Sequence, residues 1–130
     1  MRQARALLAG GVWFLLAAGP ALAQMALPAA KAPSGEDLFK RQCATCHGTS
    51  AADPPRQGPT LAGIFGRKVG AADGFRYSAG FAAADWAWDE AHLDPWLANP
   101  QAVIPGAAMP YRQSNPAVRA ALIGYLKELQ

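Results

Sequence analysis

An all-α domain of three to five short helices joined by long loops is predicted by three observations on the 130-residue chain. Apolar residues recur at helical spacing in several short segments. No segment alternates apolar and polar residues in the manner of a half-buried strand. Thirteen glycines and eleven prolines interrupt the chain and keep the helices short. With 52% apolar and 16% charged residues, the composition is that of one folded domain and not of a disordered protein.

The first predicted helix covers residues 35 to 46. Ser34 is its expected N-cap, and Asp37 follows three residues later in the pattern of a capping box. A short helix is predicted over residues 78 to 84, and Asp89 is expected to cap another that runs to residue 98. Pro95 leaves two alternatives for that helix, a kink or a new start at residue 94 with the proline as its first residue.

The last predicted helix begins at Asn115 as cap and Pro116 as first residue. Its apolar residues form one stripe at helical spacing: Val118, Ala121, Leu122, Tyr125, Leu126 and Leu129. Residues 48 to 74 and 101 to 113 show no sustained period and are predicted to be irregular. Loops of that length in a small domain indicate a function or a large group around which the chain folds.

The beginning of the chain has the layout of a secretory signal peptide, predicted over residues 1–23. Arg2 and Arg5 precede an apolar run over residues 6 to 18, and small residues occupy the cleavage positions at Ala21 and Ala23. A retained membrane anchor is the alternative. Residues 24–33 are predicted to be a flexible leader and 34–130 the domain. Cleavage lowers the formal net charge from +3 to +1, which gives no indication of a nucleic-acid partner.

The chemistry of the chain is indicated by Cys43-Ala44-Thr45-Cys46-His47, which reads C-x-x-C-H. On the predicted helix the two thiols face one side, where they can bond the two vinyl groups of a haem, and the imidazole can reach the iron. This is the attachment signature of one covalently bound haem c.

The motif has three other interpretations. A thiol–disulfide redox pair is expected within a strand–helix pattern, which the sequence lacks. A zinc site needs a fourth ligand, for which only His92 remains, and nothing in the sequence places it nearby. A chance match is the third.

The sixth ligand of the iron decides the function of such a site. A protein ligand makes it an electron-transfer centre, whereas an open position lets it bind or activate small molecules. Met25, His92 and Met109 are the candidates, and spacing alone leaves the choice open.

The sequence resembles the class I c-type cytochromes over about residues 35 to 129. Matching segments occur in the family's order and spacing: Gly35, Phe39, the haem motif, residues 58–61, 63–70 and 74–78, Trp88, Asn99-Pro100, Ile104-Pro105-Gly106 with Met109, and Leu122 with Tyr125-Leu126. The resemblance implies the cytochrome c fold, wrapped around one haem.

The resemblance also implies a role for each site residue. Cys43 and Cys46 would be the thioether anchors, and His47 and Met109 the axial ligands. The Pro59 carbonyl would accept a hydrogen bond from His47. Tyr77 and Trp88 would donate to a haem propionate, with Arg67 nearby to offset its charge. Trp96 stands beside the methionine ligand, where many relatives have tyrosine. Gly35 and Phe39 would meet Leu122 and Tyr125 where the first and last helices cross.

The function predicted on this basis is that of a periplasmic monohaem one-electron carrier, which is not an enzyme. It would be a monomer that docks transiently with redox proteins and has no small-molecule substrate. Few lysines surround the expected haem edge, so docking should depend weakly on salt. One alternative is a dedicated cytochrome subunit or acceptor of a periplasmic dehydrogenase, with Trp86 at the interface. The other is a haem ligand sensor or weak peroxidase, which requires Met109 to be off the iron.

Overall fold

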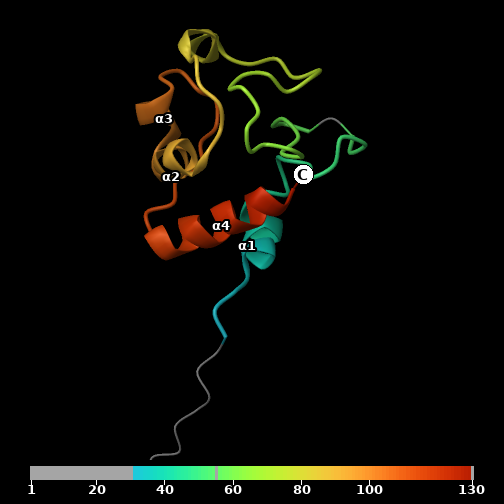
Figure 1. Ribbon diagram of the computed structural model, residues 1–130, viewed down its shortest axis with the longest axis vertical. Coiled ribbons are helices and arrows are strands. Elements are labelled where there is room, and N and C mark those ends of the chain that lie inside the picture. The colour runs from blue at the N-terminus through green and yellow to red at the C-terminus, as the bar shows by residue number, and fades with distance from the viewer. Residues whose placement is uncertain (1–30, 55, 130) are drawn as a thin grey trace, which may run out of the picture. The chain divides into compact units, whose positions relative to one another are not determined.

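The computed structural model describes residues 31–54 and 56–129, which contain four α-helices and one 3₁₀ helix (Figure 1). The elements in chain order are α1 (Gly35–Gln42), η1 (Ala79–Ala83), α2 (Glu90–Ala98), α3 (Pro100–Val103) and α4 (Pro116–Glu128). The β pairing within the described residues is one isolated antiparallel bridge between Lys68 and Ala87. The all-α prediction is therefore confirmed. The predicted signal peptide, most of the predicted leader and Met25 lie outside the described residues.

Helix α1 begins as predicted and ends four residues early. The Ser34 hydroxyl accepts a hydrogen bond from Asp37 N, and the Asp37 carboxylate accepts one from Ser34 N, which completes the capping box. The predicted continuation to residue 46 is wrong. Cys43 N and Ala44 N both donate to Phe39 O, at 2.8 and 3.0 Å, so the regular α pattern ends there. The haem motif consequently lies in a turn directly after the helix and not on it.

Helix α2 runs from its Asp89 cap through Pro95 to Ala98 without a new start at residue 94. A further helical turn, α3, follows at once, although residues from 101 onward were predicted to be irregular. Pro100 explains the difference, because its fixed φ favours the first position of a helix. The turn closes with Ile104 N donating to Pro100 O at 2.9 Å.

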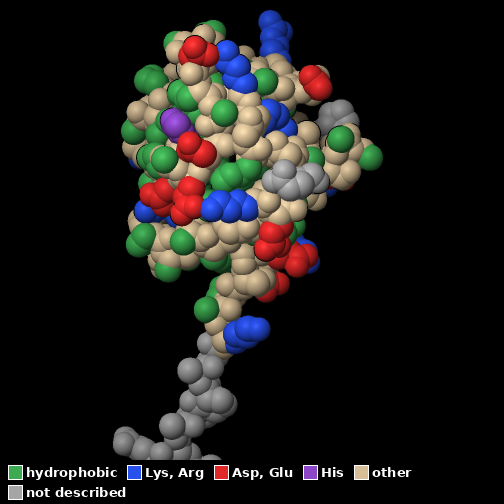
Figure 2. All heavy atoms as spheres, viewed as in Figure 1, with side chains coloured by type: hydrophobic (Ala, Val, Ile, Leu, Met, Phe, Trp, Pro, Cys, Tyr) green, Lys and Arg blue, Asp and Glu red, His purple; other side chains and the backbone are tan. Residues whose placement is uncertain are grey.

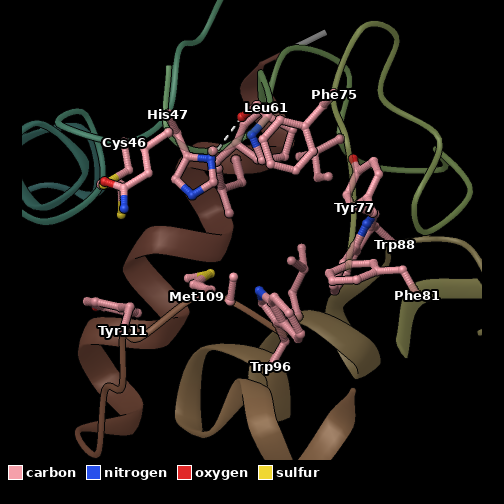
Figure 3. A pocket seen from close by; sticks show the side chains of 18 of the residues that line it. Cys46, His47, Leu61, Phe75, Tyr77, Phe81, Trp88, Trp96, Met109 and Tyr111 are labelled. Atoms are coloured by element: carbon pink, nitrogen blue, oxygen red, sulfur yellow. Dashed lines mark hydrogen bonds between the residues drawn. The ribbon is translucent and has the colours of Figure 1, made fainter. Parts of the chain in front are cut away.

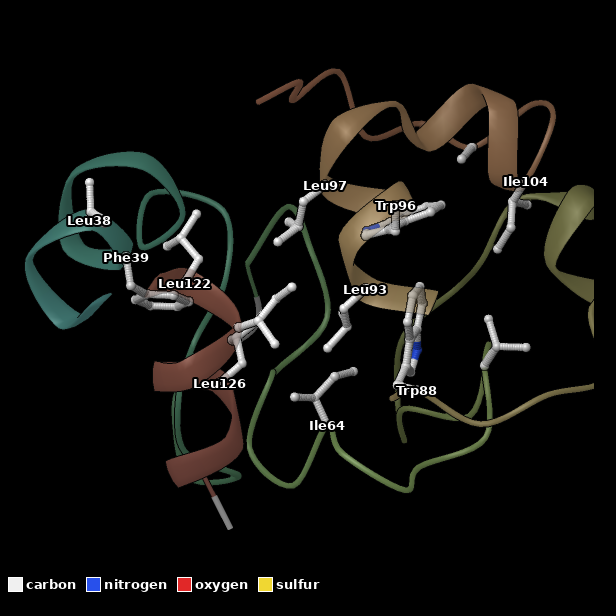
Figure 4. Packing of buried hydrophobic residues seen from close by; sticks show 13 residues of the cluster. Leu38, Phe39, Ile64, Trp88, Leu93, Trp96, Leu97, Ile104, Leu122 and Leu126 are labelled. Carbon is white, nitrogen blue, oxygen red and sulfur yellow. The ribbon is translucent and has the colours of Figure 1, made fainter. Parts of the chain in front are cut away.

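Helices α1 and α4 cross in close contact, with Gly35 at the crossing. A Cβ atom at Gly35 would lie 2.9 Å from Tyr125 Cβ and closer still to the carbonyl oxygen of Ala121. The Phe39 and Tyr125 rings pack with their centroids 5.3 Å apart. Phe39 and Leu122 lie together in Figure 4, and both are buried. The predicted meeting of the first and last helices is confirmed.

The core continues from this crossing to α2 and the loops that precede it (Figure 4). Leu93, Trp96 and Leu97 of α2 are buried. Ile64 of the long irregular segment and Trp88, between η1 and α2, are buried with them. Charged side chains of both signs are scattered over the face drawn in Figure 2. Among the described residues, no helix combines the length and the apolar character needed to cross a membrane.

Candidate haem site

An apolar cavity of about 430 Å³ lies between the turn after α1, the long loops, α2 and the segment that leads to α4. Its volume is within the range of pockets that bind small molecules and cofactors. All nine residues assigned to the site from the sequence line it: Cys43, Cys46, His47, Pro59, Arg67, Tyr77, Trp88, Trp96 and Met109. The fold therefore brings together residues that are spread along the chain from position 43 to position 109.

His47 is held in one orientation by the loop opposite it. Its Nδ1 lies 2.8 Å from the carbonyl oxygen of Pro59. A carbonyl can only accept, so Nδ1 carries the proton and Nε2 keeps its lone pair. Burial lowers the pKa of His47, and the bond to Pro59 opposes that shift, so the neutral imidazole is favoured. Gly58 leaves room for the ring, because a Cβ there would lie 2.7 Å from Nδ1.

The two cysteines lie on the same wall of the cavity as His47. The turn that carries them is closed by Cys46 N and His47 N, which donate to Cys43 O at 3.0 and 2.9 Å. Burial raises the pKa of the Cys43 thiol to about 11. A thiol–disulfide exchange centre needs a lowered cysteine pKa, so this environment does not favour that interpretation.

His92 is not among the residues that line the cavity. It lies on α2, where its Nδ1 is 2.7 Å from Asp89 Oδ1. Among residues 31–54 and 56–129, no cluster of three or more histidine, cysteine or acidic side chains is arranged to hold a metal ion. The zinc interpretation therefore finds no fourth ligand in this part of the chain.

Met109 projects into the cavity from the side opposite His47 (Figure 3). It lies in the irregular segment between α3 and α4, and its side chain is half-buried. Trp96 of α2 lies below it in the view of Figure 3 and is 7% exposed. A thioether and an imidazole thus face each other across an apolar space. Methionine with histidine is one ligand pair of haem iron in proteins that transfer electrons.

One side of the cavity carries polar hydrogens that the protein itself does not use. Arg67 donates to Ala62 O at 3.0 Å and to Thr60 O at 2.8 Å, while its Nε is buried without a partner. Ser78 Oγ is also buried without a partner. Tyr77 accepts a bond from Ala72 N at 3.2 Å and keeps its hydroxyl proton for another acceptor.

Such a site fits a largely apolar group that carries carboxylates at one edge, because buried donors require acceptors. Haem is a group of that kind. Ser78 follows Tyr77 directly and lines the same cavity, although the sequence did not predict a role for it. Phe75, Phe81 and Tyr111 also line the cavity and were not predicted to do so. Phe75 and Tyr111 lie in segments without a helical period, so apolar spacing does not identify them. Phe81 lies in η1, where a single aromatic residue in one short turn gives no periodic signal.

Trp86, considered above as an interface residue, packs within the domain. Its ring stacks on His92 with centroids 4.3 Å apart and 9° between the planes. It also meets Trp88 edge-on at 4.7 Å. Trp86 thus packs within the domain, while its side chain stays partly exposed.

A helical chain around an apolar cavity, with C-x-x-C-H in its wall, defines the haem proteins of the c type. The family model described as "Cytochrome c" matches residues 32–130. The cytochrome c of Guizotia abyssinica is 42% identical over 101 residues, which cover 77% of this chain and 91% of the relative. Those of Nigella damascena and Chlamydomonas reinhardtii are 40% and 41% identical over 102 residues, or 78% of this chain and 92% and 91% of theirs.

The chain belongs to the cytochrome c family. It is a monohaem electron carrier with one covalently attached haem c, and it is not an enzyme. Its partners are redox proteins that bind transiently, and it has no small-molecule substrate.

Proposed function

We propose that this cytochrome is exported and carries single electrons in the periplasm as a monomer. Residues 1–23 would be the signal peptide, 24–33 a flexible leader and 34–130 the haem domain. The basic start, apolar run and small cleavage residues of the first segment support export.

The observation on which the site assignment rests is that His47 and Met109 face each other across the cavity, with both cysteines on the histidine wall. Cys43 and Cys46 would hold the haem through thioethers, and His47 and Met109 would bind its iron. The haem supplies a one-electron redox couple. Methionine with histidine raises its reduction potential. The Pro59 bond fixes the His47 tautomer and keeps the imidazole basic.

The unused polar hydrogens support a propionate site at the Tyr77 side of the cavity. Arg67 Nε and the Tyr77 hydroxyl would donate to the propionates, with Trp88 beside them. Because Arg67 is anchored to two carbonyls, its charge stays in place when the iron changes oxidation state. Trp96 would contact the Met109 side. A site whose dipoles are already oriented reorganises little during electron transfer.

Partner docking should depend little on long-range charge. Three lysines of the domain surface are each paired with a carboxylate: Lys40 with Glu36, Lys68 with Asp85 and Lys127 with Glu90, at 2.7, 2.7 and 2.6 Å. Paired charges present no strong positive field to a partner, and the expected net charge after cleavage is only +1. A small and mainly neutral contact with the partner is consistent with a transient complex.

The ferric absorption spectrum of the holoprotein tests the ligand assignment. We expect a low-spin spectrum with the weak sulfur-to-iron band in the far red, and loss of that band in Met109→Ala. The ferrous parent should resist carbon monoxide, whereas Met109→Ala should bind it readily. A high-spin parent that binds carbon monoxide as well as the variant does would favour the ligand sensor or weak peroxidase.

Location and partners need separate measurements. Mass spectrometry of periplasmic protein should show one haem and a chain that begins at Gln24. A membrane-bound chain that retains its first residues would contradict export with cleavage. Stable co-purification with one dehydrogenase would favour the dedicated subunit over the free carrier.

A further inference from the structure

Met109 lies in a segment that has no helix of its own to hold it. Residues 104 to 115 connect α3 and α4 without regular structure. The ends of this segment are anchored. Near its start, Gly106 N donates to Gln101 Oε1 at 3.1 Å. Near its end, Arg119 donates to the carbonyl oxygens of Gln113 and Ser114, both at 3.0 Å. Met109 itself sits between these anchors.

A hydrogen bond to a distant part of the chain lies close to Met109. The Tyr111 hydroxyl donates to Gln42 Oε1 at 2.6 Å, across 69 positions of sequence. Gln113 Nε2 lies 3.3 Å from the same Gln42 oxygen and 3.4 Å from the Tyr111 hydroxyl. The three side chains form one small network, which we call the Tyr111–Gln42 latch.

The two ends of the latch belong to opposite walls of the cavity. Gln42 is the last residue of α1 and directly precedes Cys43. Tyr111 follows Met109 by two positions and lines the cavity (Figure 3). Gln42 lines the cavity too. The latch therefore joins the wall that carries the cysteines and His47 to the segment that carries Met109. If Met109 leaves the cavity together with its segment, the bond must break.

We propose that Tyr111 and Gln42 are positioning residues that fasten the Met109 segment to α1 and thereby keep the methionine on the iron. This inference rests on the proposed ligation by Met109. Neither residue binds the iron. The latch acts on the balance between the closed segment, in which the sixth position is filled, and an opened segment, in which an outside ligand can enter.

Binding of imidazole to the ferric holoprotein measures that balance, because imidazole must take the position that the methionine sulfur leaves. Loss of one hydrogen bond of ordinary net strength should raise the apparent imidazole affinity about two- to tenfold. We expect this for Tyr111→Phe, which keeps the ring. Gln42→Leu removes the acceptor of both bonds and should have at least the same effect. Gln42→Glu keeps an acceptor at the same chain length and should bind imidazole as the parent does.

Tyr125→Phe is the matched control, since it removes a tyrosine hydroxyl on α4, where the ring packs on Phe39 of α1. The control should leave imidazole affinity unchanged, even if it lowers the unfolding midpoint. The double variant Tyr111→Phe/Gln42→Leu should exceed Gln42→Leu by little, because both changes break one network.

The outcomes separate the latch from the ligand assignment. If the parent has the far-red band and resists imidazole while Tyr111→Phe and Gln42→Leu match it, the latch is refuted and Met109 ligation stands. If Tyr125→Phe raises the affinity as much as Tyr111→Phe, the effect is one of general stability and the latch is refuted. If the parent lacks the band and binds imidazole as Met109→Ala does, both proposals fail.

Discussion

Replacing Gly35 with alanine should destabilise the folded protein, because the new methyl group would enter the crossing of α1 and α4. The added Cβ would lie 2.9 Å from Tyr125 Cβ, and the carbonyl oxygen of Ala121 is nearer still. Ordinary contacts begin near 3.4 Å, so the helices must separate by at least about 0.5 Å. Ala121 O belongs to a helix backbone and cannot rotate away. Overpacking of this kind costs about 1–3 kcal/mol.

The helical preference of alanine offsets little of that cost, because Gly35 is the first residue of its helix. For a domain of this size, each kcal/mol lowers Tm by about 4–8 °C. Guanidinium unfolding of the ferric holoprotein, followed by far-ultraviolet circular dichroism, gives the free energy of unfolding directly.

Gly124→Ala provides a control with the opposite expected sign. Gly124 is an exposed residue inside α4, and a Cβ there would meet no atom within 4 Å. Without a clash, alanine should stabilise the helix by roughly 0.5–1 kcal/mol. If Gly35→Ala proves as stable as the parent, or both variants shift in the same direction, the close crossing does not limit the fold as argued.

Three further predictions address the site and the surface. Gly58→Ala would place a methyl group 2.7 Å from His47 Nδ1 and strain the hydrogen bond to Pro59. A weaker bond should make the imidazole of His47 less basic and the reduction potential of the haem more positive. A voltammogram that matches that of the parent would argue against this. Asp53 accepts hydrogen bonds from Ser50 N and Thr49 N, which lower its pKa. Its stabilisation is therefore present above the ordinary aspartate pKa and is lost as the pH falls through the lower folded pKa. Asp53→Asn should flatten the acid dependence of the unfolding free energy, and equal slopes in parent and variant would refute the assignment. The paired lysines predict that the rate of oxidation of the ferrous protein changes little with ionic strength, both for the anion ferricyanide and for the cation tris(phenanthroline)cobalt(III). If the rate with ferricyanide alone falls steeply as ionic strength rises, the surface carries an unbalanced positive charge and the prediction is wrong.

Local sequence patterns predicted the ends of those helices whose end is set by residues a few positions away. The capping box at Ser34 and the Asn115-Pro116 start of the last helix follow from hydrogen bonds within a few positions. The end of α1 was not predicted, because Cys43 and Ala44 both compete for the Phe39 carbonyl. Apolar spacing does not report such a change in backbone pairing.

The sequence by itself determined the class of this protein, since C-x-x-C-H and the family's separated segments are read directly along the chain. The nine residues that it assigned to the site all line the cavity, whereas Phe75, Phe81 and Tyr111 also line it and were not predicted. Tertiary structure decided what contacts those residues make. The crossing at Gly35 and the Tyr111–Gln42 bond join segments that are distant in sequence. The packing of the chain also buries Arg67 Nε without a partner. Their geometry depends on how the loops pack around the cavity, which no local pattern specifies.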